Sequence, residues 1–125
     1  MSESDKEIRW LGSTLKDLSA MPDEVKRPLG YGLRLAQKGE RAPDAKTLKG
    51  YDGAVELIED HDGDSYRAVY TTRIDSAVYV LHCFQKKSTN GIAIPKHDKT
   101  TIESRLKDAR RDAEDQRSAS KSKGH

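Results

Sequence analysis

Four nitrogen-bearing side chains in the middle of the sequence could act together in acid–base and phosphate chemistry. Arg67 and Arg73 are separated by an even number of residues, and so are His82 and Lys86 in the next β-like run. Alternate side chains project from the same face of a regular strand, so each pair is expected on one sheet face. If the two faces coincide, the sheet carries a cationic surface on which His82 can exchange protons near neutral pH.

That combination meets the chemical demands of RNA cleavage. The ribose 2′-hydroxyl must lose a proton, the phosphorane needs its negative charge stabilised, and the departing 5′-oxygen must gain a proton. Arginine and lysine stabilise the charge, and His82 or a perturbed lysine transfers the proton. Each residue also has a structural interpretation: His82 as a satisfied core residue, Arg67 and Arg73 as solvent-facing charges, Lys86 and Lys87 as protection of a sheet edge.

Other polar and reactive residues indicate function less directly. Tyr70, like the other strand tyrosines, either packs in the core or stacks on a base. Cys83 is expected to be an inert core thiol. The acidic segment 60–65 places carboxylates at alternate positions as a calcium loop does, but it lacks the required glycine and glutamate, so it predicts a hairpin turn. No Cys/His spacing fits a zinc site, and neither a metal nor a cofactor is expected.

Length and composition limit the class of protein. The chain has 125 residues, of which 34% are hydrophobic and 35% charged, which predicts one domain with a small core under a charged surface. Its single cysteine excludes an internal disulfide. No apolar run approaches the roughly 18 residues of a membrane span and the first residues have no apolar signal region, so we expect no membrane association and a cytoplasmic location.

The formal net charge of +2 conceals an uneven distribution. Residues 52–64 contain six acidic residues and no Lys or Arg, whereas residues 65–97 contain five basic residues and one acidic residue. A local basic cluster can bind phosphates even in a nearly neutral chain, because the interaction depends on the groups at the contact. The alternative is that these runs are ordinary solvated faces.

Hydrophobic spacing predicts two helices before the strands. A short helix is expected over 13–21, and a second from Asp23 to Lys38, where apolar residues recur every three or four positions and Gly39 follows. Pro28 falls inside the second helix, which predicts a bend or a start nearer Arg27. Residues 40–53 are expected to form a connecting loop.

Three strands and a final helix complete the expected elements. The strands are predicted over 54–59, 66–74 and 77–86 as an antiparallel meander, the last one apolar on both faces and therefore central. The final helix is expected to begin at Asp98 or Thr100, with an apolar stripe that ends at Ala113. Residues 1–115 are predicted to form the domain, and 116–125 a disordered basic tail.

Several stretches of the sequence resemble one family. They are RWLGSTLKDL, LAQKGERAPDAKTLKG, VELIEDHDGDSYRAVYTTR and VYVLHCFQKKSTNGIAIPKHD, which begin at residues 9, 35, 55 and 78. The chain resembles the RelE/HigB-type toxins of bacterial type II toxin–antitoxin systems, in particular the phage-derived Gp49-like branch. The resemblance implies a RelE/ParE-like α+β fold, with a small antiparallel sheet packed against two N-terminal helices on one side and followed by a C-terminal helix.

The resemblance also implies an enzyme, an mRNA endoribonuclease that inhibits translation, often at the ribosome, and is neutralised by a helix-turn-helix antitoxin. Arg67 corresponds to the arginine of the family's YR motif, and Lys86 and Lys87 to the basic end of the following strand. Several relatives carry a basic residue on the first hairpin strand where this chain has Glu56 and Ile58, so proton transfer is assigned to His82. The expected catalytic residues are Arg67, Arg73, His82, Lys86 and Lys87, and the expected RNA-binding residues are Tyr70, Lys96, Arg105, Arg110 and Arg111.

Two alternatives remain open from the sequence. A ParE-like toxin of the same fold would bind and inhibit DNA gyrase and would cut no RNA. A phage-derived remnant would keep the fold and have no activity.

Overall fold

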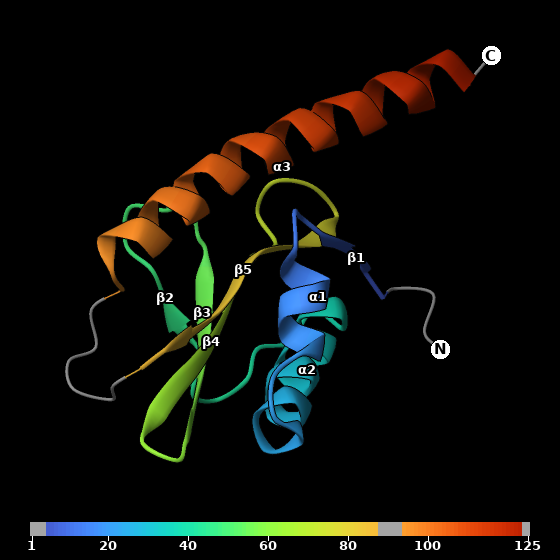
Figure 1. Ribbon diagram of the computed structural model, residues 1–125. Coiled ribbons are helices and arrows are strands. Elements are labelled where there is room, and N and C mark those ends of the chain that lie inside the picture. Colours follow the sequence, from blue (N-terminus) through green and yellow to red (C-terminus); the bar gives the residue numbers. More distant parts are fainter. Residues whose placement is uncertain (1–4, 88–93, 124–125) are drawn as a thin grey trace.

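The computed structural model of the chain describes residues 5–87 and 94–123, with side chains as far as Ala119. It is an α+β structure in which a five-stranded sheet lies between helices (Figure 1). The strand order is β1-β5-β4-β3-β2. The elements are β1 (Glu7–Trp10), α1 (Thr14–Ser19), α2 (Asp23–Gln37), β2 (Lys46–Thr47), β3 (Val55–His61), β4 (Asp64–Thr71), β5 (Ala77–Lys86) and α3 (Lys96–Lys123).

The central part of the sheet is the predicted antiparallel meander. Strands β3 and β4 are joined by Asp62 and Gly63, both with positive φ (50° and 81°), as the tight turn of a two-residue hairpin requires. Strand β5 pairs with β4 along most of its length, and it lies next to β1 on its other side. The predictions of a hairpin at the acidic segment and of a central β5 are therefore confirmed.

The sheet is mixed, which corrects the expectation of a purely antiparallel one. Strand β1 runs parallel to β5, with Ile8 opposite Val78 and Trp10 opposite Val80. Strand β2 adds two residues at the far edge, within the segment predicted to be a loop. Both strands are too short to show a periodic pattern in sequence, so only their pairing with longer strands reveals them.

Helices cover both faces of the sheet, whereas the resemblance to the RelE/HigB-type toxins implied helices on one side only. One core lies between the sheet and α1 and α2, and includes Leu29, Leu33 and Val80. A second core lies between the sheet and α3, and includes Leu81 and Ile102. Strand β5 contributes to both cores, which is why its sequence is apolar at almost every position.

Helix α2 begins at Asp23 and runs without interruption past Pro28, so the later start near Arg27 is not observed. Pro28 is the sixth helical residue, and the only helical donor it removes is the one that would bond to Glu24 in the first turn.

Helix α3 packs through the predicted stripe, in which Ile102, Ala109 and Ala113 are at most 1% exposed. None of the described helices combines the length and apolar composition that a membrane crossing requires.

Helix α3 continues to Lys123, past the predicted beginning of a disordered tail at Gln116. Its C-terminal part extends away from the sheet (Figure 1), and every described side chain after Ala113 is exposed. Alanine, arginine and glutamine are good helix formers, so this segment can stay helical without a packed face. The proposed boundary of the domain at residue 115 remains a prediction.

Candidate active site

A buried arginine–carboxylate pair occupies the α3-facing side of the sheet near the β3–β4 hairpin. The Arg67 Nη1 atom lies 2.9 Å from Oε2 of Glu56, and the Arg67 Nε donates to the Ser65 hydroxyl at 3.2 Å. Both partners of the ion pair are 3% exposed. Arg67 lies two residues before Val69, which belongs to the core under α3, so the alternation of β4 places Arg67 on that same face.

His82 reaches this face because of a β-bulge in β5. The register changes from Val69–His82 to Tyr70–Val80, so Leu81 is an extra residue without an opposite partner. The His82 ring stacks on Phe84 with centroids 4.5 Å apart, and Phe84 lies opposite Arg67 in the sheet. The bulge therefore places both Leu81 and His82 on the α3 side.

The protonation of His82 is set by burial and by a carboxylate. Its Nε2 lies 2.7 Å from Oδ1 of Asp98 in the first turn of α3. Burial lowers the pKa of His82, and Asp98 opposes that shift only in part. The imidazole is therefore neutral at neutral pH, and Nε2–H donates to Asp98. Its Nδ1 is buried and has no hydrogen-bond partner among the described residues, so it is the nitrogen left to accept a proton.

Arg105 borders the same region from α3. Its Nη1 donates to the Leu81 carbonyl oxygen at 3.1 Å, and its positive charge contributes to lowering the pKa of His82. The guanidinium passes so close to Gly12 that a Cβ there would lie 2.7 Å from Nη2. Arg105 is therefore held in place between the bulge of β5 and the loop before α1.

The two lysines at the end of β5 differ in position. Lys86 is opposite Ser65 in the register and shares a face with His82 and Arg67, since no irregularity separates residues 82 and 86. It is half-buried, whereas Lys87 follows the strand and is exposed. The structure thus brings three of the five expected catalytic residues, Arg67, His82 and Lys86, onto one face.

Arg73 does not join them. Strand β4 ends at Thr71, so the alternation that would align Arg73 with Arg67 stops before Arg73 is reached. The Arg73 side chain instead crosses Gly53, just before the start of β3, so it lies beyond the end of β4 that is remote from the β3–β4 turn. The expectation that Arg67 and Arg73 share one face of a regular strand was wrong for this reason.

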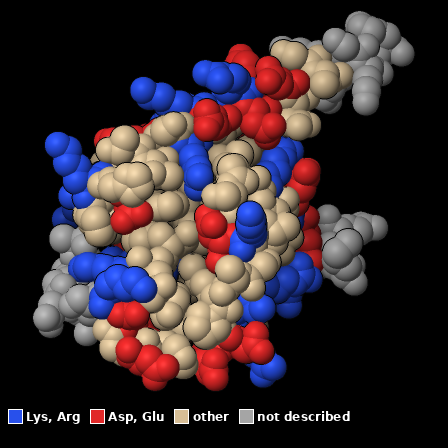
Figure 2. Space-filling model, viewed as in Figure 1, with Lys and Arg blue, Asp and Glu red and all other residues tan. Residues whose placement is uncertain are grey.

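The residues expected to contact RNA are dispersed. Tyr70 is 2% exposed in the core beneath α2, so its ring packs there and cannot stack on a base. Lys96 begins α3 and is exposed, as are Arg110 and Arg111 further along the helix. Arg110 forms an ion pair with Asp52. Basic and acidic side chains are mixed along α3 at the top of Figure 2, so the helix does not present a uniformly basic face in this view.

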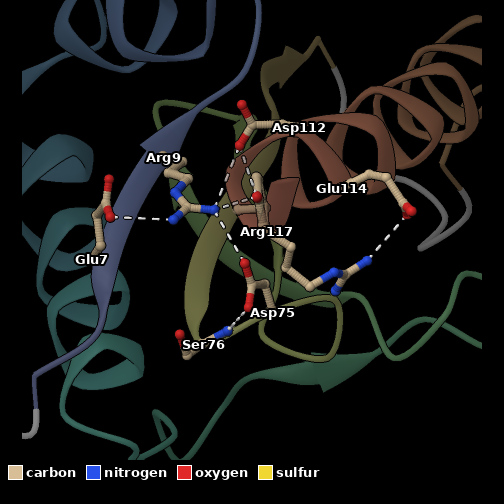
Figure 3. A network of polar contacts seen from close by, with 8 residues as sticks. Glu7, Arg9, Asp75, Ser76, Asp112, Glu114 and Arg117 are labelled. Carbon is tan, nitrogen blue, oxygen red and sulfur yellow. Dashed lines mark hydrogen bonds and ion pairs between the residues drawn. The ribbon is translucent and has the colours of Figure 1, made fainter. Parts of the chain in front are cut away.

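A second polar network, which the sequence did not predict, joins β1 to β5 and α3 (Figure 3). The Arg9 guanidinium contacts Glu7 at 3.2 Å and both Asp75 and Asp112 at 3.5 Å, and it also donates to the Tyr79 hydroxyl. Tyr79 in turn donates to Asp112 at 2.8 Å. Burial, together with the hydrogen bond to Asp112, raises the pKa of Tyr79 to about 12, so the phenol stays protonated. This network fastens the middle of α3 to the sheet.

The charged partners Glu56 and Asp98 are the residues of the candidate site that sequence reasoning missed. Glu56 was noted only as a departure from the basic residue of relatives, and Asp98 only as a helix cap. One signal was present: Glu56 alternates with the apolar Val55 and Leu57 inside a strand, and a buried acid needs a cation opposite it. Among residues 5–87 and 94–123, no group of three or more His, Cys, Asp or Glu side chains could hold a metal ion.

Comparison with known proteins defines the class of the chain. The family of phage-derived Gp49-like proteins matches residues 16–107, which begin within α1 and include α2, the whole β3–β5 meander and the first turns of α3. The chain belongs to this family, which is a RelE/HigB-type toxin family. No curated protein and no solved structure matches the chain.

Proposed function

We propose that this protein is the toxin of a type II toxin–antitoxin system and that it cleaves mRNA without a metal ion, at the ribosome. The observation that carries the proposal is the placement of Arg67, His82 and Lys86 on one sheet face in a chain of the Gp49-like family. Cleavage would stop translation in the cytoplasm, and a helix-turn-helix antitoxin would be the neutralising partner.

The proposed reaction is an internal transesterification. His82 Nδ1 removes the proton from the ribose 2′-hydroxyl, whose oxygen attacks the adjacent phosphorus. The P–O5′ bond breaks, and the imidazolium returns its proton to the 5′-oxygen. The products are a 2′,3′-cyclic phosphate and a 5′-hydroxyl end. Lys86 and Arg67 stabilise the additional negative charge of the phosphorane.

Two contacts must change for this reaction to occur. Arg67 is paired with Glu56, so a phosphate has to compete with that carboxylate for the guanidinium. The Nδ1 of His82 is buried, so substrate binding has to expose this edge of the ring. Asp98 would keep the ring in the tautomer that leaves Nδ1 unprotonated, which makes it a positioning residue for His82.

The proposal is tested by primer extension on a defined mRNA in a bacterial translation extract. We expect cuts confined to translated codons, resistant to EDTA, and absent when Arg67→Ala replaces the wild type. Naked mRNA in buffer separates ribosome dependence from intrinsic cleavage. An intact message in the presence of the folded wild-type chain contradicts the proposal. Co-purification with the product of a neighbouring helix-turn-helix gene tests the antitoxin.

The burial of the catalytic candidates favours a second function. Arg67 is 3% exposed and His82 is 9% exposed, and each already has a carboxylate partner. A non-catalytic, ParE-like toxin would use these residues only to stabilise the sheet and would inhibit DNA gyrase through its surface. A gyrase supercoiling assay distinguishes the two: inhibition together with an intact message supports the binding toxin. An inactive remnant would give neither result.

A further inference from the structure

A small cavity at the rim of the sheet collects positive charge from three separate parts of the chain. Its volume is about 290 Å³, and it lies between the end of α2, the beginning of β3 and the segment after β4. Three cations and one carboxylate line it, together with a tyrosine and a glycine that form part of its wall. These residues are Lys6, Arg41, Arg73, Glu40, Tyr70 and Gly53.

The cations of this rim cavity are not neutralised by ion pairs. Within the part of the chain that the structure describes, Lys6, Arg41 and Arg73 form no ion pair, and the only side-chain hydrogen bond of the three joins Arg41 Nη2 to the Ala45 carbonyl at 3.1 Å. The adjacent hollow shares Arg73 and has a volume of about 430 Å³, but its other two arginines are paired, Arg110 with Asp52 and Arg117 with Glu114. The rim cavity therefore has positive charge available for an anion.

The backbone at Gly53 determines where Arg73 lies. Gly53 has a φ of +71°, and a Cβ at this position would be 2.3 Å from Arg73 Cδ. Only glycine both adopts this conformation easily and leaves room for the arginine side chain to cross it. The position of Arg73 on the cavity wall thus depends on a close approach that any other residue at 53 would block.

Tyr70 adds a hydrogen-bond donor to the same wall. Its ring is 2% exposed, packed in the core under α2. Burial raises the pKa of Tyr70, and the nearby positive charge of Arg41 opposes that shift. The phenol is therefore protonated at neutral pH. Two guanidinium groups, an ammonium group and a phenol around one small volume are the donors that proteins use for phosphate oxygens.

We propose that the rim cavity is a binding site for a phosphoryl group, carried by a free nucleotide or by an RNA chain. It is separate from the candidate active site, because Tyr70 and Val55 on its wall belong to the core beneath α2, whereas Arg67 and His82 face α3. Arg73, which the sequence placed with Arg67, is a ligand-binding residue of this second site. The proposal does not depend on RNA cleavage.

The test is isothermal titration calorimetry of the purified full chain at low ionic strength. The first two probes are inorganic phosphate and 5′-AMP. A third probe is a short 2′-O-methyl oligoribonucleotide with and without a 5′-phosphate, which cannot be cut through its 2′-position. We expect saturable binding that weakens at least about tenfold in Arg73→Gln and further in the Arg41→Gln/Arg73→Gln double variant. Tyr70→Phe, which keeps the packed ring, should show a smaller loss.

The matched control is Lys38→Gln, which removes another exposed positive charge at the end of α2, beside the lining residue Gly39 but not itself in the wall of the cavity. Lys38 contributes only a longer-range charge, so the loss of affinity in this variant should be smaller than that of Arg73→Gln. When the titration is repeated at an ionic strength of about 0.1 M, which screens such charges, the affinity should stay within about twofold of the wild type. Tightest binding of 5′-AMP identifies a nucleotide site, and dependence on the 5′-phosphate of the oligonucleotide identifies an RNA end. Equal losses in Lys38→Gln and Arg73→Gln, or no saturable binding of any probe to the wild type, overturn the proposal.

The binding titration and the cleavage assay together show whether the phosphoryl site and the proposed ribonuclease activity fail independently. If the wild type binds the phosphorylated probes but leaves mRNA intact in the translation extract, the ribonuclease proposal fails and the phosphoryl site stands. If it cuts mRNA but binds none of the probes, the reverse holds. Circular dichroism of each variant confirms that a loss of binding is not a loss of folding.

Discussion

The two charged regions of this molecule differ in what their arginines are paired with. In the candidate active site, Arg67 and Glu56 are each 3% exposed and lie 2.9 Å apart, so the charge of one neutralises that of the other. In the rim cavity, Arg41 and Arg73 are exposed and form no ion pair within the described chain. A buried pair fixes geometry but must be broken before it can bind substrate, whereas an exposed unpaired cation can bind an anion at once.

The largest expected effect is the loss of stability when the buried Arg67–Glu56 pair is broken. Arg67→Ala should lower the free energy of unfolding by about 3–5 kcal/mol, because it leaves the Glu56 carboxylate buried without its cation. Urea denaturation of the purified variant measures this loss. The control is Glu56→Met/Arg67→Met, which replaces both charges and should be as stable as the wild type within about 1 kcal/mol or more stable. Equal destabilisation by the single and the double variant would show that the pair is not what Arg67→Ala disrupts.

The next largest effect is the difference in mRNA cleavage between variants of Lys86, which shares the face of Arg67 and His82, and of Lys87, which follows the strand. Lys86→Ala should reduce mRNA cleavage by about 10²-fold, the usual cost of losing one group that stabilises the transition state. Lys87→Ala, one residue beyond the strand, should reduce it by less than about tenfold. Cleavage is measured by primer extension, and urea denaturation confirms that both variants keep wild-type stability. Similar losses in the two lysine variants would count against the register argument that separates them.

The pH dependence of stability tests the buried histidine. Because burial lowers the pKa of His82, the unfolded chain takes up a proton that the folded chain does not as the pH falls below about 6.5. Stability should therefore be full above that pH and decrease as the pH falls through the folded-state pKa, by at most about 1.4 kcal/mol per pH unit. In His82→Gln this part of the slope should vanish. Parallel stability curves for the two proteins between pH 7 and pH 5 would contradict the assignment.

The smallest effect concerns the end of α3. A chain that stops after Asp115 should differ from the full chain by less than about 0.5 kcal/mol in unfolding free energy, because every described side chain beyond Ala113 is exposed. Thermal unfolding of the two chains makes the comparison. A loss above about 1 kcal/mol would mean that the domain does not end at residue 115.

The predictable parts of the fold are those marked by a short turn motif or by an apolar pattern that extends over many residues. The turn at Asp62 and Gly63 follows from residue types that tolerate positive φ, and the double burial of β5 follows from its continuous apolar run. Strand β1 was missed because it has four residues and is recognisable only by its pairing with β5. The α3 stripe was predicted correctly, because a helix of this length repeats its pattern several times.

The candidate site was harder to predict because it depends on irregularities and on long-range pairing. The bulge at Leu81 shifts His82 relative to β4, and nothing in the local sequence marks it. Arg73 falls after the end of β4, where strand alternation no longer applies. The rim cavity joins Lys6, Arg41 and Arg73, which are more than thirty residues apart in sequence, so only the folded chain brings them together.

Primer extension in the translation extract tests whether Arg67 and its sheet face cleave mRNA. The samples are the wild type, Lys38→Gln and Glu56→Met/Arg67→Met. The double variant removes the guanidinium without leaving a buried carboxylate unpaired, so we expect it to fold, and urea denaturation checks that a loss of activity is not a loss of folding. We predict codon-confined cuts with the wild type and with Lys38→Gln, and an intact message with the folded double variant. Wild-type cleavage by the double variant would contradict the assignment of the active site to this face of the sheet.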